Sequence, residues 1–212
     1  MDAFNNITGT IAPLPAANID TDVIMPKQFL KGIDRQGLDR GVFFDLRFLP
    51  DGSPNPDFIL NQPGWENASF LLVGANFGCG SSREHAVWGL NQLGIRAIIG
   101  TSFAGIFDDN CQRNGVLTLT LSEEDYQRLS TVAADAKHNR ITVSLEQQII
   151  LFNNQSITFS VSALKREMLL GGGSAVDWTL QYEDDISNFE AQHFAQRPWL
   201  KRDSAIKDAQ HE

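Results

Sequence analysis

Residues able to do chemistry gather in one glycine-rich stretch, Gly74–Ala86, which we call the motif loop. Its second part, Gly78–His85, reads GCGSSREH. Glycines let the backbone approach a ligand closely, and the first amides of a following helix carry the positive end of its dipole. Ser81 and Ser82 add hydroxyls, and Arg83 adds a guanidinium that can hold a carboxylate through two parallel hydrogen bonds. The motif loop therefore predicts a binding site for an anion.

Two simpler interpretations of the Ser-Ser-Arg triplet stay open at this point. A serine at the start of a helix commonly caps that helix, and an arginine beside it needs no function. Phosphate binding without catalysis is the second interpretation, although GCGSSR has neither the lysine of a P-loop nor the third spaced glycine of a dinucleotide-binding fingerprint. A stand-alone anion-binding module is therefore an alternative to an enzyme.

The cysteines and histidines do not predict a metal or cofactor bound by this chain itself. Cys79 and Cys111 are the only cysteines, whereas an iron–sulfur cluster usually takes three or four thiolates. The four histidines stand outside any zinc-binding spacing. We expect Cys79 to be a small packed residue of the motif loop and Cys111 to be structural.

Composition limits the classes of partner. The chain has 212 residues and a net charge of −9, and this acidity weighs against binding nucleic acid. No stretch approaches the roughly 18 to 20 apolar residues that cross a bilayer, so we expect no membrane association. The N-terminal residues lack the pattern of a signal peptide, which predicts a cytoplasmic location.

The elements around the motif loop predict an α/β fold. Phe70–Gly74 is a continuous apolar run, typical of a strand covered on both faces, and Glu84–Leu93 has helical spacing. Ala97–Gly100 reads as a second buried strand and Val116–Leu121 as a third, with a helical segment at Phe103–Cys111 between them. Strands that alternate with helices in this way indicate a parallel sheet.

Flanking segments predict shorter elements. In the region before residue 65, which is rich in proline and glycine, we expect strands near Gly9–Ala12 and Val23–Met25, a short helix near Lys27–Lys31 and a surface turn at Asp51–Pro56. Ser122 is expected to cap a helix that runs to about Lys137. Beyond it the sequence predicts an antiparallel meander of three strands at Ile141–Leu145, Gln148–Phe152 and Ser156–Val161. Two helices are expected after it, at Ser162–Leu170 and Glu183–Gln196. The whole reads as a single domain over residues 1–200 with a polar, mobile tail at 201–212.

The string Gly78–Ala86 resembles the swivel-domain signature of the aconitase superfamily, Gly-x-Gly-Ser-Ser-Arg-Glu-His-Ala after a buried strand. Asn18–Pro26 is similar to that family's Asn-x-Asp-Thr-Asp-x-Ile-x-Pro element, and Phe103–Asn110 is similar to its Phe-Ala-x-Ile-Phe-x-x-Asn element. Lys27–Leu30 and Phe43–Asn61 resemble segments of bacterial 3-isopropylmalate dehydratase small subunits.

The resemblance extends over roughly residues 7 to 196, with Thr179-Leu180 at the position of a C-terminal Thr-Leu pair. Two departures are visible. The helix after the motif continues with Val87-Trp88-Gly89-Leu90 where the family usually has Pro-Trp-Ala-Leu. Near the C-terminus, Gly172-Gly173-Ser174 stands where Gly-Leu-Asp is usual.

The resemblance implies a fold, an activity and a partner. The fold would be a swivel domain (β/β/α) with a mostly parallel sheet, flanking helices and a small antiparallel meander. The activity would be that of a hydro-lyase, which isomerises 2-isopropylmalate and 3-isopropylmalate through 2-isopropylmaleate in leucine biosynthesis. A large subunit would form a heterodimer or higher assembly with this chain and carry the 4Fe-4S cluster. A related hydro-lyase acting on homoaconitate, citraconate or methylmalate is the nearer alternative.

The resemblance also implies roles for individual residues. Ser81 would be the base that removes a proton beside a carboxylate of a small dicarboxylate substrate. Substrate binding would fall to Gly80, Ser82 and Arg83. The residues expected to arrange the site are Asp20, Thr21, Asp22, Glu84 and His85. Taken alone, Asp20–Asp22 reads equally as an Asx-type turn, and Glu84 and His85 as side chains that satisfy the loop's own backbone groups.

Overall fold

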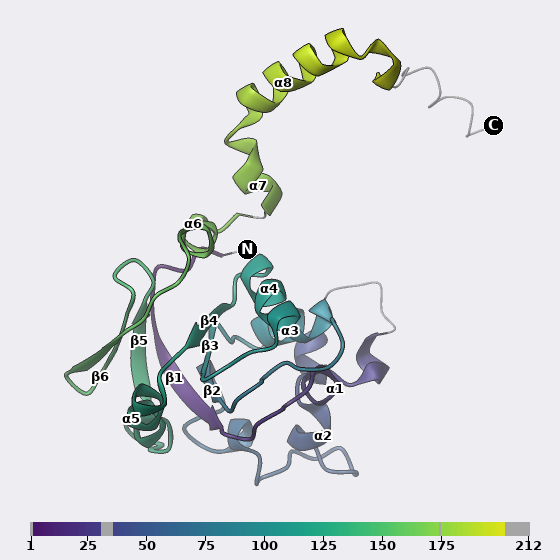
Figure 1. Ribbon diagram of the computed structural model, residues 1–212. Coiled ribbons are helices and arrows are strands. Elements are labelled where there is room, and N and C mark those ends of the chain that lie inside the picture. Colours follow the sequence, from purple (N-terminus) through teal and green to yellow (C-terminus); the bar gives the residue numbers. More distant parts are fainter. Residues whose placement is uncertain (1, 31–35, 174, 202–212) are drawn as a thin grey trace. The chain divides into compact units, whose positions relative to one another are not determined.

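The computed structural model describes residues 2–30, 36–173 and 175–201 (Figure 1). Contacts within the chain define two compact units, Met1–Ser174 and Ala175–Glu212. The first holds the sheet and the motif loop, and the described part of the second, residues 175–201, is mainly helical. A single domain over residues 1–200 stays a prediction, and the expected tail lies outside the described residues apart from Lys201.

A seven-stranded sheet forms the centre of the first unit, in the order β4-β3-β2-β1-β5-β6-β7. Strands β1 to β4 pair in parallel, and β5, β6 and β7 add to β1 as an antiparallel meander. The strand bounds are β1 Asn6–Leu14, β2 Ala68–Val73, β3 Ala97–Gly100, β4 Leu117–Thr120, β5 Arg140–Ser144, β6 Ile149–Phe152 and β7 Gln155–Thr158. The predicted parallel core and meander are both confirmed.

Both faces of the parallel strands are covered, which explains the continuous apolar run in β2. Leu71 and Val73 belong to one hydrophobic core, and Phe70 and Leu72 belong to the other. Helices α3 (Glu84–Gln92) and α4 (Gly105–Arg113) contribute to the first core, and α5 (Glu123–Ala133) and α6 (Ala163–Gly171) contribute to the second (Figure 1). Two opposite cores of this kind hold the carboxyl ends of the strands at fixed positions.

The segment between β1 and β2 contains only short helical elements: α1 Thr21–Ile24, η1 Lys27–Leu30, η2 Leu38–Gly41, α2 Phe44–Arg47 and η3 Ile59–Asn61. The predicted strand at Val23–Met25 is wrong, because this segment lies in and just after α1. The Asp20 carboxylate caps that helix by accepting a 2.8 Å hydrogen bond from the Val23 amide. One N-cap thus outweighs the strand preference of two β-branched residues. The short helix predicted near residue 27 is confirmed by η1, while Lys31 lies outside the described residues.

The helices after β4 differ from prediction in one boundary and in one additional helix. Helix α5 ends at Ala133 and not near Lys137, because the Asp135 side chain accepts from the Lys137 amide and closes a turn. In the second unit, α7 (Ala175–Leu180) was not predicted, whereas α8 (Glu183–Gln196) has the predicted bounds and is followed by η4 (Pro198–Leu200). Helix α6 ends at its C-cap residue Gly172, which takes a left-handed conformation.

Gly89 allows α3 to pack closely against the segment between β1 and β2. A Cβ atom at this position would overlap the Met25 methyl group and lie 2.7 Å from Val42 Cγ2. We therefore expect Gly89→Ala to lower the free energy of unfolding by about 1–2 kcal/mol, although alanine favours helix. Gly105→Ala, at a helical position with open space around it, is the matched control. Urea unfolding would contradict this prediction if both variants matched the wild-type midpoint.

Candidate active site

The motif loop leaves β2 beside the segment that leaves β1. Because the two strands are parallel neighbours, both segments begin at the same edge of the sheet. They are joined by backbone hydrogen bonds: Gly78 donates to Ile19 at 2.8 Å, and Thr21 donates to Cys79 at 2.9 Å. At Gly74, any Cβ atom would overlap the Pro15 carbonyl oxygen. The Asp-Thr-Asp element and the motif loop are therefore one structural unit.

The segment after β3 supports the motif loop from another side. Phe77 is fully buried and meets the Phe107 ring of α4 edge-on, with ring centroids 5.4 Å apart. Gly78 has a positive φ of 75°, and a Cβ atom there would overlap the Phe107 ring. The Ala104 amide donates to the Phe77 carbonyl at 3.1 Å. Three loops thus meet at the carboxyl edge of the parallel strands, where ligands of α/β sheets commonly bind.

The predicted base and its neighbour are exposed on a fixed backbone. Ser81 and Ser82 are both exposed. The Ser81 carbonyl accepts hydrogen bonds from Thr21 Oγ1 at 2.9 Å and from the Arg83 amide at 2.8 Å. Gly80, with a φ of 93°, makes the turn that places Ser81 beside Thr21. The two hydroxyl-bearing residues are therefore presented to solvent from a backbone that Thr21 holds.

Arg83 lies at the start of α3 and forms an ion pair with Asp22. The Arg83 side chain is only 19% exposed, whereas that of Asp22 is 45% exposed. A guanidinium has five donors, so Asp22 can orient it and leave donors for a further carboxylate. Lys27 Nζ lies 3.9 Å from the same Asp22 carboxylate. The side chain of Arg83, the N-cap residue of α3, makes no capping hydrogen bond, which leaves the first helix amides to other acceptors.

Glu84 and His85 both contact side chains of helices around the loop. The Glu84 carboxylate accepts a 2.7 Å hydrogen bond from Asn114 Nδ2, at the end of α4, which is a side-chain contact outside the loop. The His85 ring lies 4.6 Å from that of Trp88. Sequence reasoning missed Asn114, although an asparagine followed by glycine near a predicted helix end is a recognisable C-terminal signal.

The sequence-predicted residues therefore come together from two segments about 60 positions apart. Asp20, Thr21 and Asp22 reach the motif loop through a backbone bridge, a hydroxyl hydrogen bond and an ion pair. Glu84 is instead directed to α4. Among the described residues, no group of three histidine, cysteine or acidic side chains could hold a metal ion.

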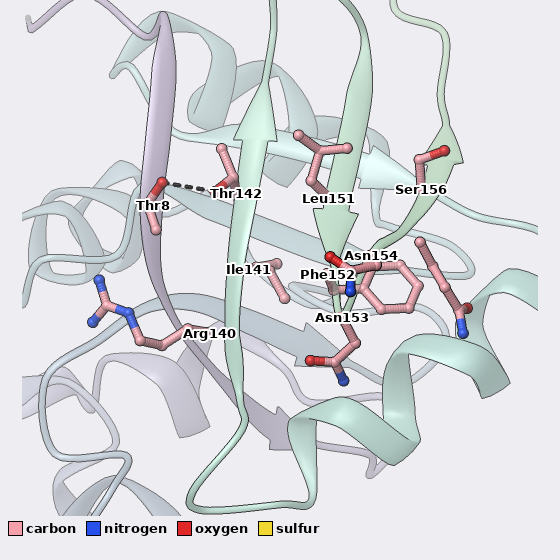
Figure 2. Close-up of a pocket in the computed structure, with 10 residues that line it drawn as sticks. Thr8, Arg140, Ile141, Thr142, Leu151, Phe152, Asn153, Asn154 and Ser156 are labelled. Carbon is pink, nitrogen blue, oxygen red and sulfur yellow. Dashed lines mark hydrogen bonds between the residues drawn. The ribbon is translucent and has the colours of Figure 1, made fainter.

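A hollow of about 580 Å³ lies elsewhere, on the antiparallel strands (Figure 2). Its lining includes Arg140 but no acidic residue, and none of its residues belongs to the motif loop. Thr8 and Thr142 beside it satisfy each other through a 2.7 Å hydroxyl hydrogen bond. This hollow does not gather groups for acid–base chemistry, so the motif loop is the candidate site.

The two cysteines differ in reactivity on physical grounds. Burial, with a smaller contribution from Asp108, raises the pKa of the Cys111 thiol well above its ordinary value, while Cys79 is partly exposed in the motif loop. Since the thiolate is the reactive form, we expect iodoacetamide at about pH 8 to modify Cys79 in the folded chain and spare Cys111. Peptide mass spectrometry would show this, and denaturant should make both thiols reactive. Equal modification of both in the folded chain would contradict it.

Comparison with known proteins places these features in a family. The family described as "Aconitase C-terminal domain" matches residues 1–124, which include the motif loop and its supporting segments. The 3-isopropylmalate dehydratase small subunit 2 of Salmonella typhimurium (strain LT2) is 65% identical over 202 residues, covering 95% of this chain and 97% of that protein. The chain belongs to the family of 3-isopropylmalate dehydratase small subunits. The expected enzyme class and pathway, a hydro-lyase of leucine biosynthesis, are thereby confirmed for the family.

Further matches agree with this family. The small subunit 1 of Mannheimia succiniciproducens is 62% identical, covering 95% of this chain and all of that protein. The family described as the C-terminal domain of the 3-isopropylmalate dehydratase small subunit matches residues 176–203, in the second unit. A crystal structure of 3-isopropylmalate dehydratase from Methanocaldococcus jannaschii has a TM-score of 0.61 at 23% identity, covering 89% of this chain and 99% of that one. This structural likeness confirms the predicted fold.

Proposed function

We propose that this chain supplies the proton-removing and carboxylate-binding side of an active site that interconverts 2-isopropylmalate and 3-isopropylmalate. The observation that carries the proposal is the motif loop itself. It presents exposed Ser81 and Ser82 beside Arg83, which Asp22 orients at the uncapped start of α3. A dicarboxylate needs such donors, because the chain as a whole carries a net charge of −9 and repels anions.

Ser81 takes the role of the base in this proposal. A serine hydroxyl is a weak base, so its alkoxide must be stabilised by nearby positive charge. The first amides of α3 and the Arg83 guanidinium are the groups that this chain offers for that purpose. Ser82 and Arg83 hold a substrate carboxylate, and Gly80 lets the substrate approach the backbone. Thr21 fixes the loop through the Ser81 carbonyl, and Asp20 forms a backbone bridge with Cys79.

The iron–sulfur cluster of the reaction does not fit on this chain. Cys111 is fully buried in the core, which leaves Cys79 as the one partly accessible thiol among the described residues. A cluster requires three or four thiolates. The family consists of small subunits, and we propose that a large-subunit partner holds the cluster and completes the site. This chain is therefore expected to be inert alone.

Anaerobic reconstitution with the large subunit of a 3-isopropylmalate dehydratase tests this function. The absorbance of the unsaturated intermediate is followed with 2-isopropylmalate, citrate and citraconate in parallel. We expect turnover of 2-isopropylmalate by the pair and none by either chain alone. Preference for citraconate or citrate would point instead to a related hydro-lyase. Tight phosphate binding by the chain alone, without any turnover by the pair, would favour a non-catalytic anion-binding module.

No helix among the described residues is long and apolar enough to cross a membrane. We propose a cytoplasmic location for the assembly, in keeping with the small charged acids on which it is expected to act. Binding of nucleic acid is not expected, because a net charge of −9 weighs against the basic surface that phosphates require.

A further inference from the structure

The side chain of Asn114 joins the end of α4 to the start of α3. Its Nδ2 atom donates to the Glu84 carboxylate at 2.7 Å and to the Asn110 carbonyl at 2.8 Å. Its Oδ1 atom accepts from the Trp88 indole at 2.9 Å. The backbone carbonyl of Asn114 also accepts from Asn91 Nδ2 at 2.7 Å. One residue therefore holds three side chains of α3.

These three side chains lie on one face of α3. Glu84, Trp88 and Asn91 are spaced i, i+4 and i+7, which places them in a row along a helix. The row begins at Glu84, directly after Arg83 in the chain. Since α3 has no side-chain cap of its own at Arg83, the attachment to Asn114 fixes the first turn from outside the helix.

The same helix α4 supports the motif loop at its other end. Phe107 lies near the start of α4, seven residues before Asn114, and packs against Phe77 and Gly78. Positions i and i+7 share a face of the helix. Helix α4 thus contacts the motif loop before Ser81 through Phe107 and after Arg83 through Asn114. The exposed serines and the arginine lie between these two attachments.

We propose that Asn114 is a positioning residue for the motif loop. Its amide offers donors to a carboxylate on one side and an acceptor to an indole on the other, which no charged side chain of that size does. By holding Glu84 toward α4, it fixes the helix start at which Arg83 binds substrate. It also directs the Glu84 charge away from an anion on the exposed side of the loop.

The proposal is tested on the hydrogen bond between Asn114 and Glu84, which is first broken by one substitution and then restored with reversed polarity by a second. Asn114→Asp keeps the shape and the acceptor for Trp88, but it places a carboxylate against the Glu84 carboxylate, and like charges repel. Glu84→Gln in the same chain offers an amide donor to the new carboxylate and restores a hydrogen bond of opposite polarity. Trp88→Phe, which removes the indole donor together with part of the ring, shows what loss of the other contact does.

The first readout uses the chain alone and is independent of any activity. In heteronuclear NMR spectra, the amide resonances of Ser81 to Glu84 should change their chemical shifts in Asn114→Asp. In the double variant these chemical shifts should return most of the way to the wild-type values. The matched control is Asn139→Asp, which removes a 3.0 Å amide donor from the Gly64 carbonyl, away from the motif loop. It should lower stability without moving these four amides. Unmoved motif-loop amides in Asn114→Asp would overturn the proposal.

The second readout rests on the proposed function and uses the reconstituted two-subunit enzyme. We expect Asn114→Asp to lower kcat/KM about 10- to 100-fold at neutral or higher pH, with about tenfold regained in the double variant. The loss of kcat/KM should become smaller as the pH falls. Protonation of one of the two facing carboxyl groups removes the repulsion between them and lets them form a hydrogen bond. A loss that is independent of pH and not regained by Glu84→Gln would overturn the positioning role.

The two readouts separate failure of this inference from failure of the proposed function. If wild-type chain and large subunit show no turnover, the function fails, while the NMR shifts still decide the role of Asn114. If Ser81→Ala abolishes turnover but Asn114→Asp leaves both rate and amides unchanged, the function stands and the positioning role fails.

Discussion

Ser81→Ala should lower kcat of the reconstituted enzyme about 100- to 10,000-fold, the usual range for removal of a catalytic acid or base. The fold should be unaffected, because the Ser81 side chain is exposed and the contacts that fix this residue are made by its backbone carbonyl. Alanine preserves the acceptor for Thr21 and for the Arg83 amide. Thermal unfolding of the variant should therefore match that of the wild type.

Ser82→Ala is the control for this prediction. The two serines are neighbours and both are exposed, so a general disturbance of the loop would affect both variants alike. A substrate-binding role for Ser82 predicts a higher KM with a smaller loss of kcat. Turnover close to the wild-type rate in Ser81→Ala would rule out this residue as the base. An equal loss of kcat in both variants would place the effect on the loop and not on one hydroxyl.

Sequence patterns predicted the parallel core because its burial is complete. Phe70–Gly74 is apolar on both faces, and the structure places its alternating side chains in two separate cores. Prediction from hydrophobic spacing failed where a local hydrogen bond, and not the pattern of burial, determines the secondary structure. Val23–Met25 has strand-forming residues, but Asp20 caps a helix there. Local hydrogen bonds of this kind depend on the position of the flanking backbone, which hydrophobic spacing does not contain.

The site was predictable in its residues but not in their pairing. The Asp-Thr-Asp element and the motif loop were both singled out from the sequence, yet nothing in either segment specifies that Thr21 binds the Ser81 carbonyl or that Asp22 pairs with Arg83. Those contacts arise because β1 and β2 are parallel neighbours that end at one edge. Asn114 was missed for the same reason, since the side chains that it joins to α4 belong to another helix.

Arg83→Lys should raise KM of the reconstituted enzyme about 10- to 100-fold with a smaller effect on kcat. Both side chains are cationic, so the net charge of the site is unchanged. Lysine replaces a planar pair of donors by a single charged point and loses the bidentate grip on a carboxylate. It also reaches Asp22 less well, so the orientation that this ion pair gives the wild-type side chain is weakened. Steady-state kinetics with 2-isopropylmalate measure the change.

Arg96→Lys is the matched control for Arg83→Lys. The Arg96 side chain is 21% exposed, close to the 19% of Arg83, and it also faces an aspartate, Asp2. It lies just before β3, at the amino edge of the strand, whereas Arg83 follows the carboxyl edge of β2. The same chemical change at Arg96 should therefore cost stability at most and leave KM unchanged. If Arg96→Lys raised KM as much as Arg83→Lys, the effect would be general, and the assignment of the substrate carboxylate to Arg83 would fail.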